Sequence, residues 1–168
     1  GRNRPARRVE RDGVARLAER AGDVDVLVAN AALPGSGSLF GFSPEEVDRA
    51  LDVNLRAPVM LTRLLAEGMV ARGAGHLVFI SSMAGRTATG GGSAIYSATK
   101  FGLRGFGQSL RADLRGTGVG VSVVFPGFIR DAGMFHESGT SLPSYVGTST
   151  PQEVADGVLR AIEHDREI

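Results

Sequence analysis

Three short apolar runs, separated by segments with helical periodicity, are the feature that most constrains the fold of this chain. The runs are VDVLVAN (24–30), HLVFIS (76–81) and VGVSVVFPG (119–127), all rich in β-branched and aliphatic residues. Uninterrupted apolar strands of this length are typical of parallel sheets, whose strands are buried on both faces. We therefore expect each run to form a strand that is covered on both sides.

The first of the intervening segments has clear signals for the start of a helix. It covers 43–73, with Ser43 as N-cap, Pro44 at the first helical position and Glu46 as the partner in a capping box. Its apolar residues recur at helical spacing, and Pro58 within it marks a kink or a boundary between two helices. We expect one long helix, or two that follow each other directly.

Two more helical segments complete the pattern. One covers 93–116 and closes at Gly116, and the other covers 151–165 with Thr150 as its cap. Alternation of strands and helices predicts an α/β fold with a parallel sheet and right-handed crossovers. The pattern shows no internal repeat and no linker, so we expect a single domain over residues 1–168.

Two segments are expected to form loops at the ligand-binding edge of this sheet. They are 32–42, after the first strand, and 128–150, after the third. Ligands of such sheets bind beyond the carboxyl ends of the strands, where both loops begin. Four residues of the second loop suggest a lid over an apolar or amphipathic substrate: Met134, Phe135, Leu142 and Tyr145.

Charge and composition exclude several classes of function. The net charge is +1, so nothing requires a nucleic acid or an anionic membrane as partner, and no apolar run is long enough to span a bilayer. The sequence has no cysteine, which rules out disulfides and thiolate metal sites and is compatible with a cytoplasmic location. His76, His136 and His164 lack ligand spacing, so we expect no metal. The five arginines among the first eleven residues predict a solvated helix face or a frayed end rather than a phosphate-binding arm.

The most informative pair of residues is Tyr96 and Lys100. The chain has 18 arginines but this single lysine, and it stands four residues after one of only two tyrosines. On a helix these two side chains are neighbours. An isolated phenol has a pKa of about 10, and a nearby cation lowers it towards the range useful for proton transfer. The pair therefore suggests a general acid and the group that tunes it, although the spacing alone is common.

Further motifs surround this pair in a defined order. They are NA at 30–31, DVNL at 52–55, SSMAG at 81–85, YSATK at 96–100 and PG at 126–127. Together they resemble the short-chain dehydrogenase/reductase family, from about Asp23 to the end of the chain. The resemblance implies a Rossmann-like, doubly wound parallel sheet in three α/β/α layers. It also implies NAD(P)(H) as cofactor and hydride transfer between a secondary alcohol and a ketone.

The resemblance implies a role for each of four catalytic residues. Tyr96 matches the tyrosine that exchanges a proton with the substrate oxygen, and Lys100 matches the lysine that lowers the tyrosine pKa and binds the nicotinamide ribose. Ser82, rather than Ser81, matches the serine that orients the substrate, because Ser82 is the one followed by xxG. Asn54 matches the asparagine that holds a water in the proton relay.

The resemblance also implies cofactor contacts at the ends of two strands. Asn30 and Ala31 match the strand end near the adenine side. Pro126 and Gly127 match the turn that lines the nicotinamide pocket, with Ile129 just beyond it. Tyr96 and Lys100 complete the expected set of cofactor-binding residues.

The sequence departs from the family pattern in three places. The glycine-rich phosphate-binding turn, TGxxxGxG, is absent before the first apolar run. The sequence also stops at DREI, about where the family's last strand would begin, so we expect a domain that is incomplete at both ends. Asp131 stands where the family often has a threonine that contacts the nicotinamide amide. The opening GRN is similar to a segment in which an arginine meets the 2′-phosphate of NADP, so Arg2 favours NADP over NAD.

Three functions stay open from the sequence. The first is the oxidoreductase that the resemblance implies. The second is a truncated, catalytically silent relative that acts as an oligomerisation or interaction module. The third is a family enzyme of another chemistry, such as a dehydratase or epimerase. The resemblance also implies a homodimer or homotetramer formed through the helices at 43–73 and 93–116, where Gly102, Gly105 and Gly107 would permit close approach.

Overall fold

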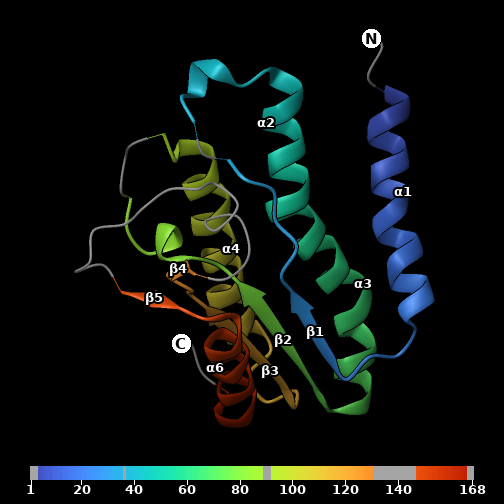
Figure 1. Cartoon of the computed structure of the whole chain (residues 1–168). Coiled ribbons are helices and arrows are strands. Elements are labelled where there is room, and N and C mark those ends of the chain that lie inside the picture. Colours follow the sequence, from blue (N-terminus) through green and yellow to red (C-terminus); the bar gives the residue numbers. More distant parts are fainter. Residues whose placement is uncertain (1–3, 36, 89–91, 131–146, 166–168) are drawn as a thin grey trace.

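The computed structural model describes residues 4–35, 37–88, 92–130 and 147–165, with side chains from residue 12 onward. Figure 1 shows the order of the elements along the chain. The elements are α1 (Arg4–Ala21), β1 (Val26–Ala29), η1 (Leu39–Gly41), α2 (Pro44–Leu51), η2 (Asp52–Arg56), α3 (Ala57–Arg72), β2 (Gly75–Ile80), η3 (Met83–Gly85), α4 (Ala94–Asp113), β3 (Val119–Val124), β4 (Phe128–Ile129), β5 (Thr148–Ser149) and α6 (Pro151–His164).

The three predicted strands form one parallel sheet in the order β1-β2-β3. Val78 of β2 lies opposite Val28 of β1 and Ser122 of β3. Strands β1 and β3 lie inside their apolar runs, and β2 begins one residue before its run and ends one residue before the run does, so these predictions are confirmed. The short strands β4 and β5 pair with each other in a second, separate sheet.

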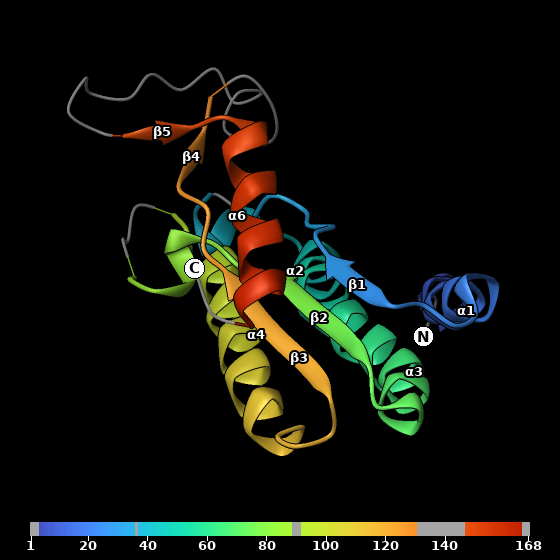
Figure 2. The same cartoon turned by 90° about the horizontal axis from the view of Figure 1, so that it is seen from below.

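Helices cover the sheet on both faces, which confirms the expected α/β/α layers. Figure 2 shows α6 on one side of the sheet and α3 and α4 on the other. The larger apolar core lies on the α3 and α4 side and includes Met69, Leu77, Phe79, Leu103 and Val121. The smaller core packs Val78, Ile80 and Val124 against Ala161 of α6. Burying a side chain of this size contributes about 1.5–3 kcal/mol, so most of the fold's stability comes from these two layers.

Strand β1 differs from the expectation that all three strands are covered on both faces. Leu27 and Ala29 face the larger core, but Val26 and Val28 are 42% and 46% exposed. The reason is the position of α6, which packs over β2 and β3 and does not reach β1. An apolar run shows that a strand is compatible with burial, not that a helix covers both of its faces.

The start of the long helical segment is confirmed, and its interior differs in detail. Ser43 and Glu46 form the expected capping box. The helix continues through Pro58, and the irregular part is a π-helical turn at Asp52–Arg56 that precedes the proline. Pro58 has no N–H to donate to the carbonyl of Asn54, and its ring crowds that carbonyl, so the turn before it widens.

The other two helices also begin where the sequence predicts. Thr150 and Glu153 form a capping box at the start of α6. Helix α4 begins at Ala94 but ends at Asp113, three residues before the predicted Gly116. Gly116, with φ of 81°, lies within the turn that leads into β3.

Two of the three glycines expected at a subunit contact pack inside the chain instead. A Cβ on Gly107 would lie 2.5 Å from Val123 and 3.0 Å from Phe79, so this glycine lets α4 lie directly on the sheet. A Cβ on Gly102 would lie 3.0 Å from Leu55 of the π-helical turn. At Gly105 an added Cβ meets no described atom within 4 Å.

The glycine pair in α4 provides a test of this packing. Gly107→Ala is expected to lower the free energy of unfolding by about 1–3 kcal/mol, because its Cβ overlaps the sheet. Gly105→Ala is the matched control in the same helix and should stabilise the protein by up to about 1 kcal/mol. Denaturant unfolding measures both. A Gly107→Ala protein as stable as Gly105→Ala would contradict the packing described here.

Candidate active site

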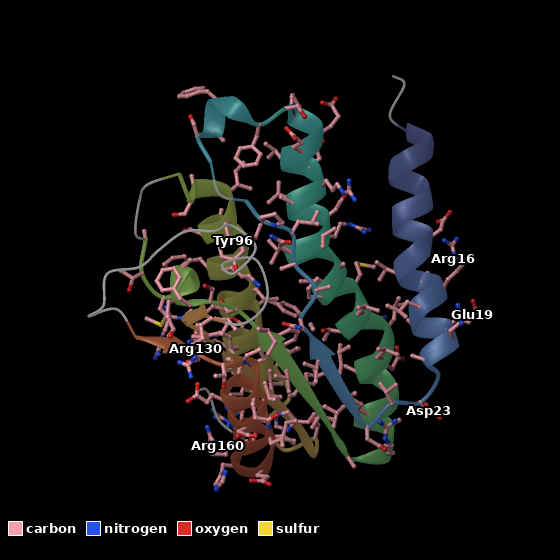
Figure 3. All side chains as sticks on the ribbon, viewed as in Figure 1. Arg16, Glu19, Asp23, Tyr96, Arg130 and Arg160 are labelled. Atoms are coloured by element: carbon pink, nitrogen blue, oxygen red, sulfur yellow. The ribbon has the colours of Figure 1, made fainter. Side chains whose placement is uncertain are left out.

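The parallel sheet brings the ends of its three strands to one edge. Asn30 follows β1, Ser82 follows β2 and Pro126 follows β3. The turns after β2 and β3 are joined, because the N–H of Met83 donates to the Pro126 carbonyl at 3.0 Å. Figure 3 shows Tyr96 on the part of α4 that lies beyond the carboxyl end of β2. The residues expected to act together therefore lie at the edge where ligands bind.

Ser82 is the serine that contacts Tyr96. Its hydroxyl oxygen accepts a hydrogen bond from the Ala84 N–H at 3.2 Å, which caps the short helix η3. The same hydroxyl forms a side-chain hydrogen bond with the Tyr96 phenol. Ser81 is buried, and its hydroxyl donates to the Lys100 carbonyl at 3.0 Å. The two adjacent serines therefore serve different partners.

The Tyr96 phenol lies in the first turn of α4 and is half-buried. Burial raises its pKa above the ordinary value, and the hydrogen bond with Ser82 acts in the opposite direction but is the weaker influence. This differs from the expectation that Lys100 lowers the Tyr96 pKa. The sequence spacing shows that the two side chains are neighbours but not how much water is removed from the phenol.

Lys100 is almost completely buried, with 3% of its surface exposed. Its ammonium donates to the Ile80 carbonyl at 2.8 Å and lies 5.5 Å from the centre of the Tyr96 ring. Burial lowers the pKa of Lys100 to about 8, because the charged form loses its hydration. At neutral pH the side chain is still mostly an ammonium.

Asn54 connects two parts of the site through its side chain. Its amide oxygen accepts from the Leu33 N–H at 2.6 Å, and its amide nitrogen donates to the Leu33 carbonyl at 2.9 Å and to the Thr99 hydroxyl at 3.5 Å. Thr99 in turn donates to the Tyr96 carbonyl at 2.8 Å. Asn54 therefore fixes the loop after β1 against the helix that carries Tyr96.

Two glycines shape the site in ways that the sequence did not predict: Gly35 was not singled out, and Gly85 was used only as the last residue of the SxxG motif. Gly35 is buried, and a Cβ there would lie 3.1 Å from the Tyr96 nitrogen and 3.2 Å from the Tyr96 Cβ. A Cβ on Gly85 would overlap the Ser81 hydroxyl. In the sequence Gly35 follows Pro34 and cannot be told apart from an ordinary turn glycine. Gly85, in contrast, could be recognised because it is the glycine of the SxxG motif.

The expected cofactor-binding residues lie along the same edge. Asn30, Ala31 and Gly127 are exposed, Pro126 is half-buried, and Ile129 is half-buried in β4, opposite Ser149 of β5. Exposed main-chain N–H and C=O groups at such an edge can form hydrogen bonds with the hydroxyl groups and the amide of a nicotinamide riboside.

Some expectations fall outside the described residues. They concern Arg2, Asp131, Met134, Phe135, His136, Leu142 and Tyr145.

The described residues contain no group of three or more acidic, histidine or cysteine side chains that could hold a metal ion. Within the same ranges, no helix is long and apolar enough to cross a bilayer. A cavity of about 650 Å³ lies at the opposite end of β2 and β3, next to Arg111 and Asp165, and contains none of the expected catalytic residues.

Comparison with known proteins decides the family. Residues 6–142 match the family model described as short chain dehydrogenase. The chain belongs to the short-chain dehydrogenase/reductase family. This confirms the resemblance that the five motifs indicated.

Three relatives illustrate the match. The chain is 40% identical over 143 residues to the ketoacyl reductase HetN of Nostoc sp., covering 85% of this chain and 50% of HetN. It is 34% identical over 144 residues to the NADP-dependent 3-hydroxy acid dehydrogenase YdfG of Escherichia coli, covering 81% of this chain and 58% of YdfG. The crystal structure of a 3-oxoacyl-[acyl-carrier protein] reductase with bound NAD from Brucella melitensis superposes with a TM-score of 0.76 at 29% identity, covering 92% of this chain and 63% of that one. The chain thus spans about half the length of the curated relatives it matches.

The burial of Lys100 gives a direct prediction. Because the chain has a single lysine, labelling with ¹³C-lysine yields one side-chain resonance to follow against pH. In the folded protein it should titrate with a pKa of about 8. In denaturant the same resonance should titrate at about 10.4. A folded-state pKa at the denatured value would show that the ammonium is hydrated and not buried as described.

Proposed function

We propose that the protein is an NAD(P)-dependent oxidoreductase that interconverts a secondary alcohol and a ketone, with Tyr96 transferring the proton. The observation that carries the proposal is the convergence of Ser82, Tyr96 and Lys100 at the carboxyl edge of the sheet. The phenol has the Ser82 hydroxyl as a partner, and the buried Lys100 ammonium lies 5.5 Å from the centre of its ring. Such an arrangement is suited to proton exchange with a substrate oxygen.

Tyr96 carries its proton in the free protein. Burial raises its pKa above the ordinary value, so at neutral pH the phenol is protonated and holds its proton more tightly than a free phenol does. Ser82, hydrogen-bonded to the phenol, is placed to donate to the same substrate oxygen and to orient it. The Lys100 ammonium then stabilises the phenolate that proton donation leaves behind.

Lys100 and the turn of Pro126, Gly127 and Ile129 would hold the nicotinamide half of the cofactor, with Asn30 and Ala31 further along the same edge. When bound, the nicotinamide ring supplies or accepts the hydride. We favour NADP, since the YdfG relatives are named as NADP-dependent. The Brucella reductase was solved with NAD, so titration of both cofactors belongs to the test.

The names of the relatives suggest a substrate class. A ketoacyl reductase and a 3-hydroxy acid dehydrogenase both act on an acid or acyl chain that carries a keto or hydroxyl group. We therefore expect this protein to act on a 3-oxoacyl or 3-hydroxyacyl group, which matches the apolar or amphipathic substrate expected from the sequence.

The test uses the full-length protein with NADPH and a 3-oxoacyl thioester, followed by the loss of NADPH absorbance. Tyr96→Phe should lower kcat at least about a hundredfold, because the proton donor is removed. Lys100→Arg should lower turnover severely while the protein stays folded, since a planar guanidinium cannot replace a compact ammonium. Circular dichroism is the control for folding.

Two outcomes would contradict the oxidoreductase. A full-length protein that binds no nicotinamide nucleotide and is indifferent to Tyr96→Phe would instead be a silent interaction module. Conversion of substrate without net oxidation of a labelled cofactor would indicate a dehydratase or epimerase.

We also propose that the protein assembles as a homodimer or homotetramer through the helical segment 43–73, which includes α3, and through α4. Leu64 of α3 and Phe101 of α4 are 45% and 38% exposed, and an apolar surface of this kind favours self-association. Phe101→Glu should shift the mass measured by light scattering towards the monomer. Leu159→Glu, a change at a 58% exposed leucine of α6, is the control and should leave the mass unchanged. If only Leu159→Glu changes the mass, the contact lies elsewhere.

A further inference from the structure

Lys100 and the end of β2 are joined by two hydrogen bonds that run in opposite directions. The Lys100 ammonium donates to the carbonyl of Ile80 at 2.8 Å. The hydroxyl of the next residue, Ser81, donates to the main-chain carbonyl of Lys100 at 3.0 Å. All three residues are buried, with exposed fractions of 8% for Ile80 and 3% for both Ser81 and Lys100. Lys100 is therefore held at its side chain and at its backbone by two consecutive residues.

Gly85 of η3 packs against the hydrogen bond between Ser81 and Lys100. A Cβ on Gly85 would overlap the Ser81 hydroxyl and would lie 2.8 Å from the Lys100 carbonyl oxygen and 3.0 Å from the carbonyl carbon. The backbone of η3 thus packs directly on the hydrogen bond between Ser81 and Lys100. A side chain at position 85 would push the hydroxyl away from its acceptor.

The two hydrogen bonds matter because a lysine side chain is long and flexible. Its ammonium can be held at one place in a buried site only if the main chain that carries it is fixed as well. Ser81 fixes the main chain, and Ile80 receives the ammonium. The Tyr96 ring, on the same helix, lies 5.5 Å from the ammonium, so a shift of Lys100 changes the electrostatic environment of the phenol.

We propose that Ser81 and Gly85 are positioning residues that hold Lys100 in its buried place beside Tyr96, an inference that rests on the proposed oxidoreductase function. Neither contacts the substrate in this proposal. Ser81 acts through the Lys100 main chain, and Gly85 acts by leaving room for the Ser81 hydroxyl.

The fold contains a matched control for Ser81. Ser122 in β3 is, like Ser81, a buried serine whose hydroxyl donates to a helix carbonyl, here that of Ala161, at 3.1 Å. It lies opposite Val78 in the sheet, and its other partner is His76, so it does not contact Lys100 or Tyr96. Losing the Ser81 hydroxyl removes one buried hydrogen bond to a helix carbonyl. Losing the Ser122 hydroxyl removes a bond of the same kind and also the one with His76, so Ser122→Ala is the more demanding control for stability.

The experiment compares Ser81→Ala with Ser122→Ala in the full-length protein. Both should lower the melting temperature by a few degrees. Only Ser81→Ala should also lower kcat, by about tenfold with KM within about twofold, because an interaction that orients the reacting groups is lost. The Lys100 pKa, read from the single ¹³C-lysine resonance, should rise by about half a unit or more in Ser81→Ala, since a less firmly held ammonium is better hydrated.

Gly85→Ala tests the same arrangement without removing a polar group. It should lower kcat and raise the Lys100 pKa as Ser81→Ala does, whereas Gly105→Ala should change neither. The decrease in kcat in the double variant Ser81→Ala/Gly85→Ala should be smaller than the product of the two single decreases, because both substitutions act on one hydrogen bond.

A lower melting temperature with wild-type kcat and wild-type Lys100 pKa in Ser81→Ala would overturn the proposal and leave Ser81 a purely structural residue. Equal catalytic losses in Ser81→Ala and Ser122→Ala would overturn it as well. The lysine titration needs neither cofactor nor substrate. An inactive wild-type protein would therefore contradict the proposed function, while the pKa comparison would still decide whether Ser81 holds Lys100.

Discussion

The direct contact of α4 with the sheet is the constraint on which the rest of the structure depends. Gly107 lets the helix backbone approach Phe79 and Val123 without an intervening side chain, and Phe106 packs edge-on against Phe79 at a ring distance of 5.4 Å. Because α4 lies this close to the sheet, its first turns meet the end of β2, and Lys100 can reach the Ile80 carbonyl. A helix held further from the sheet would leave that ammonium in water. Packing in the middle of the molecule thus sets the chemistry at its edge.

The site is also electrostatically unfavourable in a way that suggests function. Burial shifts the pKa of Lys100 down and that of Tyr96 up, so each group is pushed towards its neutral form. One carbonyl and one hydroxyl compensate only in part for the lost hydration. Perturbed titrating groups of this kind are concentrated at functional sites, where a stability cost is tolerated for reactivity. Arginine, which keeps its charge under all ordinary conditions, could not respond to burial in this way.

The sequence was most informative where local chemistry decides the structure. The capping residues Ser43 and Thr150 place two helix starts, and the apolar runs place the strands, because both depend on neighbours in the chain. Features that depend on distant contacts were not predictable. The exposure of Val26 and Val28 follows from where α6 lies, and the raised Tyr96 pKa follows from how much water the fold removes. Asn54 was recognised by motif, but its clamp on Leu33 becomes visible only when the loop and the helix lie side by side.

The scarcity of lysine has a further consequence for how the protein opens. A protease that cuts only after lysine has a single target in this sequence, the bond between Lys100 and Phe101, and this bond lies inside α4. Cleavage requires an extended backbone, so the helix must first unfold and leave the sheet. When opening and closing are fast, the cutting rate reports how often that happens. The same residue that serves the proposed chemistry thus marks the helix whose detachment would dismantle the site.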